Sequence, residues 1–168
     1  MKFLLSTLCA LFISSSALAG VGSFEFPLMS GGERNVTYKS SDFPNAVFVL
    51  EVWGYSCPYC HQNAVNVADL YNEYADNDNV QVVDVGLDRD SSSYSRWIAR
   101  HNPPQPVVQD SSRQVYNSIG GGGIPAVVVT DCNGEVLYSH NGTWDSRTKR
   151  TIRDIIESQL ESGCTPAK

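Results

Sequence analysis

Basic side chains are scarce in this sequence: its 168 residues include 12 Lys and Arg, 18 Asp and Glu, and three His. The formal net charge is therefore −6 at pH 7. Proteins that bind the nucleic-acid backbone need clustered Lys and Arg to neutralise phosphates. One cluster of four basic residues occurs within residues 147–153, and this spacing is typical of the solvated face of a helix. We predict no nucleic-acid partner.

Long apolar runs are also missing, except at the N-terminus. Lys2 supplies a positive start, residues 3–13 are mostly apolar, and small residues follow up to Ala19. This pattern is typical of a secretory signal peptide, so we predict that residues 1–19 form one and that cleavage precedes Gly20. The apolar run is shorter than the ~20 residues that span a bilayer, which argues against the alternative, an uncleaved membrane anchor.

Export would place the chain in the bacterial periplasm, or outside the cell or in the secretory lumen of a eukaryote. Without residues 1–19, the chain keeps 11 basic and 18 acidic side chains, a formal charge of −7. We expect no stable membrane insertion after cleavage, because no second segment is long and apolar enough. The length suits a single domain, residues 20–168.

Cysteines are few, and four remain after the leader: Cys57, Cys60, Cys132 and Cys164. An even number in an exported chain predicts disulfides, because the compartment permits them. Four cysteines allow three pairings. Cys57 and Cys60 are the one close pair, which leaves Cys132 to pair with Cys164.

The pattern of apolar residues predicts strands and helices in alternation. A nearly continuous apolar run at residues 46–53 predicts a strand buried on both faces. The later predicted elements, in chain order, are a helix at 58–74, a buried strand at 80–87, a helix with a serine cap at 91–101, a short helix at 111–119 and a final helix at about 146–160.

Two hairpins frame these elements. Short extended runs on either side of Ser30-Gly31-Gly32 predict the first, and the Asn133-Gly134 turn between two apolar runs predicts the second. Alternating helices and strands predict an α/β fold with a central sheet flanked by helices.

Residues 57–61, Cys-Pro-Tyr-Cys-His, allow two chemical interpretations. The C-x-x-C-H spacing is that of c-type haem attachment, whereas C-x-x-C alone is that of a redox dithiol. A haem iron needs a second axial ligand, commonly Met or His, and Met29, His101 and His140 lie on other predicted elements. Structural zinc usually needs a second C-x-x-C knuckle, which the chain lacks. We favour the dithiol and keep a haem-binding protein as the alternative.

The dithiol hypothesis explains several neighbours of the motif. Pro58 suits the first turn of a helix, which places Cys57 at the helix N-terminus, where the macrodipole favours a thiolate. Cys60 lies one turn on, in position to resolve a mixed disulfide. His61 lies four residues after Cys57 and adds positive charge when protonated. The alternative is a static disulfide.

Two further places are candidates for the same site. Glu51 is an acid within a buried strand, and burial raises the pKa of a carboxyl, which suits a proton carrier for Cys60. The alternative is a Glu at a strand edge that faces water. Ile124-Pro125 follows a run of glycines and precedes a strand, which makes it a candidate cis peptide bond that offers backbone groups to an incoming chain.

The motif "WGYSCPYC" resembles the W-x-x-x-C-x-x-C active site of thioredoxin-fold proteins, and "GGGIPAVVVTDCNGEVLYSHNG" resembles their cis-proline, strand, turn and strand. The segment "FEFPLMSGGERNVTYKSSDFPNAVFVLEVW" is similar to the N-terminal hairpin of TlpA/ResA-like periplasmic thiol–disulfide oxidoreductases. The resemblance spans about residues 24–160. It implies a thioredoxin fold, with a central mixed sheet, flanking helices and an N-terminal β-hairpin extension.

The resemblance also implies roles for individual residues. Cys57 would be the nucleophile, Cys60 the resolving thiol and Pro125 the cis-proline. Glu51 would transfer a proton, and Trp53 would pack under the site. The Pro58-Tyr59 dipeptide is that of glutaredoxins, although no glutathione-binding residues are identified.

The expected partners are protein thiols or disulfides and a redox donor or acceptor, with reduction the more expected direction. No cofactor and no metal are expected. A Cys132–Cys164 bridge would be structural and would close a 33-residue loop, worth about 3–4 kcal/mol. A second redox pair is the alternative for these two cysteines, and a non-catalytic thioredoxin-like adaptor is the alternative for the whole protein.

Overall fold

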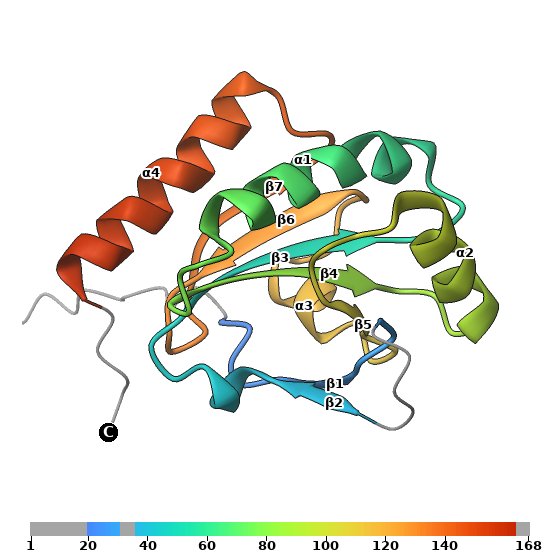
Figure 1. Ribbon diagram of the computed structural model, residues 1–168, viewed down its shortest axis with the longest axis horizontal. Coiled ribbons are helices and arrows are strands. Elements are labelled where there is room, and N and C mark those ends of the chain that lie inside the picture. The colour runs from blue at the N-terminus through green and yellow to red at the C-terminus, as the bar shows by residue number, and fades with distance from the viewer. Residues whose placement is uncertain (1–19, 31–35, 164–168) are drawn as a thin grey trace, which may run out of the picture.

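The computed structural model describes residues 20–30 and 36–163 (Figure 1). The predicted signal peptide, the glycines of the first hairpin turn and Cys164 lie outside the described residues. The apolar run predicted as a doubly buried strand forms β3 (Val47–Trp53), and all seven of its residues are buried. Its position at the centre of the sheet explains why polar residues do not alternate with apolar ones along it.

The central sheet has five strands in the order β5-β4-β3-β6-β7. β3 pairs in parallel with β4, which pairs in parallel with β5, whereas β6 runs antiparallel to both β3 and β7. The strands beside β3 are β4 (Val80–Gly86), β5 (Val107–Gln109), β6 (Ala126–Thr130) and β7 (Val136–Asn141). A separate antiparallel hairpin joins β1 (Glu25–Pro27) to β2 (Thr37–Lys39). The predicted fold class, including the hairpin extension, is confirmed.

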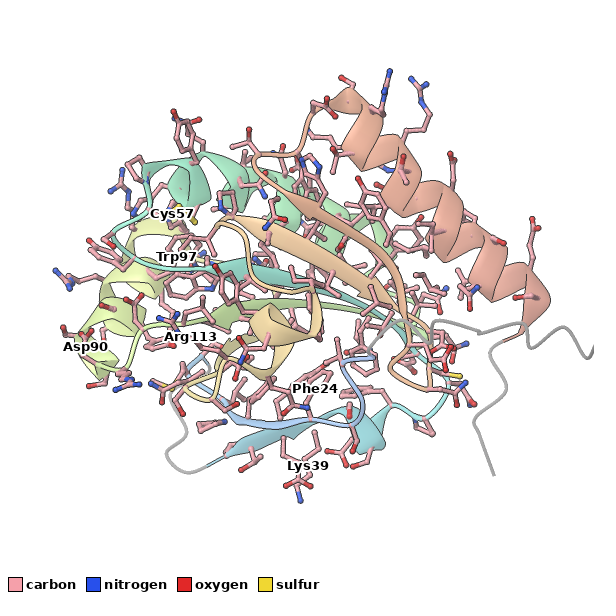
Figure 2. The ribbon with its side chains drawn as sticks, turned by 180° about the vertical axis from the view of Figure 1, so that it is seen from behind. Phe24, Lys39, Cys57, Asp90, Trp97 and Arg113 are labelled. Carbon is pink, nitrogen blue, oxygen red and sulfur yellow. A yellow bond between two sulfur atoms is a disulfide. The ribbon has the colours of Figure 1, made fainter. Side chains whose placement is uncertain are left out.

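The helices and the hairpin cover both faces of this sheet (Figure 1). α1 (Pro58–Tyr74) and α4 (Ser146–Ser162) lie on one face, where Val67, Leu70, Ile152 and Ile156 pack against alternate residues of β3, β4 and β6. The hairpin and α3 (Gln114–Ser118) lie on the other face. Figure 2 shows Phe24 between the hairpin and the sheet, where it contacts Phe48 with ring centroids 5.3 Å apart.

α2 (Ser91–His101) packs at the carboxyl end of β3 and β4, beside the start of α1. Its Tyr94 hydroxyl donates to the Gly86 carbonyl oxygen at 2.8 Å, and the ring lies where a side chain at Gly86 would be. Glycine at this position therefore lets α2 approach the sheet closely. Tyr94 and Trp97, both buried, connect the helix to Trp53 at the end of β3.

The structure corrects the sequence analysis at α2 and α4. The N-cap of α2 is Asp90, whose carboxylate accepts from the Ser93 backbone N–H at 2.9 Å, and the predicted serine cap is therefore wrong. Asp and Ser accept hydrogen bonds from the unpaired N–H groups of a helix start equally well, so the N-cap preference does not distinguish Asp90 from the serine that follows it. α4 continues two residues beyond its predicted end, to Ser162. Both differences lie within the usual uncertainty of helix ends.

β5 was not predicted as a strand, because it has three residues and follows three prolines, Pro103, Pro104 and Pro106. It pairs with the edge of β4, and Leu28, after β1, forms an antiparallel bridge with Val108. The hairpin extension is thus tied to the sheet through β5. Within residues 20–30 and 36–163, none of the helices combines the length and the apolar character needed to cross a bilayer.

Candidate active site

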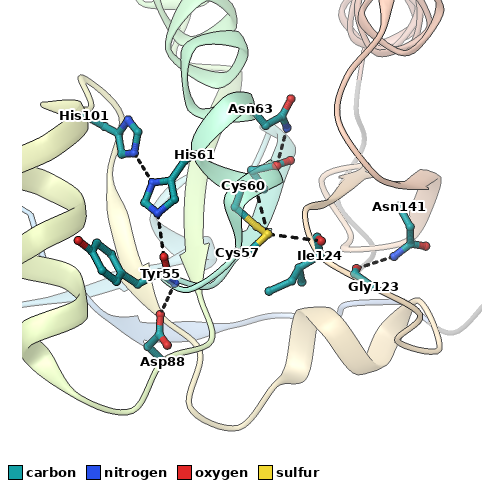
Figure 3. Close-up of a disulfide and its surroundings, with 11 residues drawn as sticks. Tyr55, Cys57, Cys60, His61, Asn63, Asp88, His101, Gly123, Ile124 and Asn141 are labelled. Atoms are coloured by element: carbon teal, nitrogen blue, oxygen red, sulfur yellow. Dashed lines mark hydrogen bonds between the residues drawn. A yellow bond between two sulfur atoms is a disulfide. The ribbon is translucent and has the colours of Figure 1, made fainter.

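The Cys57–Cys60 pair forms a disulfide at the junction between β3 and α1 (Figure 3). Cys57 is the N-cap of α1 and has extended backbone angles, and Pro58 occupies the first turn, as its fixed φ favours. The Cys60 backbone N–H donates to the Cys57 Sγ at 3.1 Å. An anion at this sulfur would be stabilised by that N–H group and by the helix macrodipole.

The two sulfurs differ in their access to solvent. Cys57 is partly exposed, whereas Cys60 is 2% exposed and packs against Trp53, Ala64 and Trp97. A substrate can therefore reach the Cys57 sulfur, whereas the buried Cys60 sulfur is reached only by groups of the protein itself, such as Cys57. Tyr59, between them, is 61% exposed and is one of the three large hydrophobic side chains exposed within the described residues.

The loop before β6 faces Cys57 from the other side of the site (Figure 3). The Ile124–Pro125 peptide bond is cis, and the Ile124 carbonyl oxygen lies 3.5 Å from the Cys57 Sγ. The Asn141 side-chain amide donates to the Gly123 carbonyl oxygen at 2.7 Å, and the Gly142 N–H donates to the Pro125 carbonyl oxygen at 2.7 Å. The end of β7 thus fixes both sides of the loop.

Glu51 is buried on the face of β3 that α1 and α4 cover. It is 2% exposed, so the alternative of a water-facing strand edge is wrong. The Asn63 amide donates to Glu51 Oε1 at 2.6 Å, and the Trp144 indole N–H donates to Oε2 at 3.1 Å. Burial raises the pKa of Glu51 well above its usual value; the Asn63 hydrogen bond lowers it, Asp84 raises it, and Trp144 lowers it.

Asp84 is a second buried acid that the sequence analysis did not single out. It lies opposite Glu51 in the β3–β4 register and is fully buried. Its Oδ2 accepts from the Trp97 indole N–H at 3.2 Å and from the Gln105 amide at 3.0 Å, while its Oδ1 has no partner within the described residues. Burial raises the pKa of Asp84 to about 7, against the lowering effect of these hydrogen bonds.

Trp53 is fully buried and packs in the same cluster as Cys60. Its ring stacks on Trp97 with centroids 4.0 Å apart and meets Tyr94 edge-on at 5.4 Å. These contacts join α2 to the base of the site. Trp97 also donates its indole N–H to the Asp84 carboxylate, so a hydrogen bond links the aromatic stack to the second buried acid.

The His61 ring points away from the disulfide, toward α2 (Figure 3). Its Nε2 lies 2.8 Å from the Tyr55 carbonyl oxygen, and its Nδ1 lies 2.7 Å from Nε2 of His101. Within the described residues, no group of three His, Cys, Asp or Glu side chains is arranged to hold a metal ion. Cys132 lies in the β6–β7 turn, at the far end of β6 from Pro125.

Residues 21–156 match the Redoxin family. The chain belongs to this family. Relatives include the thiol-disulfide oxidoreductase ResA of Geobacillus thermodenitrificans, 27% identical over 156 residues that cover 90% of this chain and 85% of the relative. The thiol:disulfide interchange protein DsbE of Vibrio cholerae is 24% identical over 147 residues, which cover 86% and 77%.

Solved structures agree on the fold. A putative thiol:disulfide interchange protein DsbE from Chlorobium tepidum superposes with a TM-score of 0.71 at 25% identity, over 88% of this chain and 99% of that one. StoA from Bacillus subtilis superposes with a TM-score of 0.64 at 18% identity, over 81% and 97%. With the Cys57–Cys60 disulfide, these findings make the protein a TlpA/ResA-like thioredoxin-fold thiol–disulfide oxidoreductase. They favour the dithiol interpretation of C-x-x-C-H over the haem interpretation.

The sequence analysis named the residues around the disulfide and missed those that hold them. The structure places Cys57, Cys60, Trp53 and Ile124 together, with the Ile124–Pro125 peptide bond cis. The partners of Glu51 are Asn63 and Trp144, and those of Asp84 are Trp97 and Gln105. Asp84 offered a signal, since it is an acid within an apolar strand just as Glu51 is. Asn63, Gln105 and Trp144 offered none, because a polar or aromatic residue in a helix or loop has many possible surroundings.

Proposed function

We propose that this protein is exported and exchanges disulfides with protein substrates through its C-P-Y-C dithiol, more as a reductase than as an oxidant. The observation that carries the proposal is the unequal burial of the two sulfurs, with Cys57 partly exposed at a helix N-terminus and Cys60 buried behind it. One thiol is then available to a large substrate, and the other acts only after a mixed disulfide has formed.

In the reductive direction, the Cys57 thiolate attacks a substrate disulfide, and the leaving substrate sulfur takes up a proton. Cys60 then loses its proton and attacks the mixed disulfide, which releases the second substrate sulfur and closes the Cys57–Cys60 disulfide. Two electrons pass to the substrate in each cycle. A donor dithiol restores the reduced protein by the same exchange in reverse.

Glu51 is the proposed proton acceptor for Cys60. Its carboxyl is buried on β3, and it is joined through Asn63 to the helix that carries Cys60. Because burial raises its pKa, the carboxyl is closer to the operating pH than an exposed Glu would be, which suits a group that takes and returns a proton. Proton transfer to Glu51 passes over the face of the sheet that α1 covers.

The Ile124–Pro125 segment is the proposed docking edge for the substrate chain. Its carbonyl group at Ile124 faces the Cys57 sulfur, and hydrogen bonds from β7 hold the loop in place. An extended substrate segment beside this loop would form backbone hydrogen bonds with it, as an added strand does at an exposed sheet edge. Tyr59 supplies an exposed apolar surface next to the attacking sulfur.

The test of activity is the reduction of insulin disulfides with dithiothreitol as the electron donor. The mature protein should accelerate reduction, and Cys57→Ser should reduce the rate to that of dithiothreitol alone. Cys132→Ser is the matched control and should keep the activity. Equal acceleration by wild type and Cys57→Ser would contradict the proposal and would favour a non-catalytic adaptor.

The direction is tested by equilibration in glutathione buffers, followed by alkylation and intact mass. A reductase should have a reduction potential below about −250 mV, toward the thioredoxin value of about −270 mV. A potential above about −180 mV would instead indicate an oxidant or isomerase. The same mass of the exported protein reports its first residue, which should be Gly20. It also counts alkylated thiols, and so decides whether Cys132 and Cys164 are bridged.

A further inference from the structure

His61 and His101 form a pair beside the disulfide. His61 belongs to the first turns of α1, directly after Cys60, and His101 is the last residue of α2. The two rings are stacked with centroids 5.0 Å apart, and the His61 Nδ1 and His101 Nε2 atoms are 2.7 Å apart. Figure 3 shows the pair on the side of the site opposite the Ile124 loop.

The partners of His61 restrict where its hydrogens lie. A carbonyl oxygen only accepts, so the His61 Nε2 must carry a hydrogen and donate it to the Tyr55 carbonyl oxygen at 2.8 Å. The neutral His61 ring then has no hydrogen on Nδ1, and His101 donates its Nε2–H to that atom. The neutral pair therefore has a single arrangement of hydrogens across the contact.

One added proton keeps this contact, and two destroy it. A first proton makes one ring cationic and still leaves a single hydrogen between His61 Nδ1 and His101 Nε2. The positive charge lies on whichever of the two rings holds that hydrogen. A second proton would put an N–H group on each side of a 2.7 Å contact. The contact therefore accommodates one added proton, which the two rings share.

The charged groups around the pair come from both helices and the intervening loops. On α2, the Arg96 guanidinium lies 4.2 Å above the Tyr55 ring. Burial lowers the pKa of His101, and His61 and Arg100 lower it further. The Asp88 carboxylate accepts from the Tyr55 N–H at 2.7 Å. Cys57 and Cys60, on the same helix as His61, carry no charge as a disulfide.

We propose that His101 is a positioning residue for the dithiol: it holds His61 against the Tyr55 carbonyl and shares one proton with it, and that charge stabilises the Cys57 thiolate. The proposal rests on the proposed function, in which Cys57 is the attacking thiolate. His61 Nδ1 is partly buried, so without His101 its protonated form would leave an N–H group unpaired. His101 thus acts through His61 and has no contact with the substrate.

The proton balance of reduction follows from this pairing. A donor dithiol gives two electrons to the Cys57–Cys60 disulfide, and its own sulfurs become joined. Its two protons pass to the protein: one makes the Cys60 thiol, and the other is shared by His61 and His101, while Cys57 stays a thiolate. The negative sulfur and the positive pair form together, so the site gains no net charge.

The first test is nitrogen-detected NMR of the histidine rings in the oxidised mature protein. His61 should show the tautomer with hydrogen on Nε2, and both rings should titrate with one midpoint and one proton between them. His140, on β7, is the internal control and should titrate alone. Two independent protons on His61 and His101, or the other tautomer of His61, would overturn the proposal without affecting the proposed function.

The second test is the pH dependence of Cys57 alkylation by iodoacetamide in a Cys60→Ser background, with the labelled peptide located by mass. His101→Phe keeps an aromatic ring beside Trp97 but no nitrogen, and should slow alkylation near pH 6 about tenfold, as for a rise of one unit in the thiol pKa. His101→Gln, whose amide oxygen accepts from His61, should restore most of the rate. His140→Gln should leave it unchanged.

An unchanged rate in His101→Phe would overturn the proposal, and so would an equal loss in His101→Phe and His101→Gln. Circular dichroism establishes that each variant is folded. If Cys57 is unreactive at every pH in Cys60→Ser with His101 unchanged, that result contradicts the proposed function instead, and the ring titrations still report whether the pair exists. The two failures are therefore distinguishable.

Discussion

Glu51 and Asp84 lie opposite one another on neighbouring strands, are both fully buried and both have a raised pKa, yet their partners differ. Both oxygens of Glu51 accept hydrogen bonds, from α1 and from the segment before α4. One oxygen of Asp84 accepts two bonds, from α2 and the loop after it, and the other has no partner within the described residues.

This difference separates two regions of one sheet face. The Glu51 region consists of Glu51 with Asn63 and Trp144, and the Asp84 region of Asp84 with Trp97 and Gln105. The Glu51 region is joined through Asn63 to the helix that carries both cysteines, and the proposed mechanism assigns proton transfer to it. The Asp84 region is joined through Trp97 to the aromatic stack under the site. We infer that, despite similar burial, Glu51 serves as a proton-transfer group and Asp84 has a structural role.

The largest expected effect is that of Glu51→Gln on the resolution of the mixed disulfide. Removing a general base typically costs about 10²- to 10⁴-fold in rate, and glutamine keeps the size of the side chain. Rapid mixing of the reduced protein with a disulfide peptide, followed by Trp fluorescence, measures this step. Asp84→Asn is the matched control and should stay within about threefold of wild type. Equal losses in the two variants would remove the distinction between the regions.

Asp84→Asn should instead change how stability depends on pH. The folded-state pKa of about 7 exceeds the usual 3.8, so the stability associated with Asp84 is fully present below about pH 4 and is lost as the pH rises to about 7. At pH 8 the loss amounts to at most about 4 kcal/mol. Urea unfolding at pH 5 and pH 8 should show a smaller difference for Asp84→Asn than for wild type. Glu51 adds a dependence of the same sign, so some difference should remain.

Trp144→Phe tests how the Glu51 region is held. The indole N–H of Trp144 donates a hydrogen bond that lowers the pKa of Glu51. Removing this bond should raise that pKa and shift the pH profile of resolution to higher pH. An unpaired buried oxygen should also cost about 1–3 kcal/mol of unfolding free energy. Trp97→Phe removes the corresponding bond to Asp84 and should leave the pH profile in place. A profile that moves with Trp97→Phe alone would reverse the two assignments.

The smallest expected effect is that of Arg153→Ala, at the far end of the Glu51 region. Arg153 on α4 makes an ion pair with Glu73 on α1 at 2.7 Å, and both side chains are nearly two-fifths exposed. Solvent screens such a pair, so its coupling energy should be below about 1 kcal/mol. A double-mutant cycle with Glu73→Ala, read by urea unfolding, measures it. A coupling energy of several kcal/mol would mean that the helix pair depends on this contact.

The sequence predicted the fold well because several local signals agree. The doubly buried run of β3, the Pro58 helix start and the Asn133-Gly134 turn each have one structural explanation, and together they leave few topologies. β5 escaped because a three-residue strand has no period to detect. The observed N-cap of α2 lies one residue before the predicted one, and the observed end of α4 lies two residues after the predicted one. Neighbouring residues at a helix end have nearly equal preferences for the helix and the loop.

The candidate site was predictable where chemistry depends on spacing along the chain, as for Cys57 and Cys60. It was not predictable where chemistry depends on what packs across the sheet. Trp144 reaches Glu51 from 93 residues away, and His101 reaches His61 from 40 residues away. Such contacts are set by how helices lie on the sheet, and a single sequence has no period or motif that records them.

The most direct test of the account is to trap the mixed disulfide on a protein substrate. Reduced Cys60→Ser should accumulate a covalent complex with insulin through Cys57, visible as added mass that dithiothreitol removes, because the Cys57 thiolate attacks an insulin disulfide, the other insulin sulfur leaves as a thiol, and no thiol resolves the mixed disulfide. Cys57→Ser, in which the Cys60 sulfur is buried, should accumulate almost none. A complex that forms equally well, or better, through Cys60 in the Cys57→Ser variant would contradict the assignment of the attacking thiol and the proposed mechanism with it.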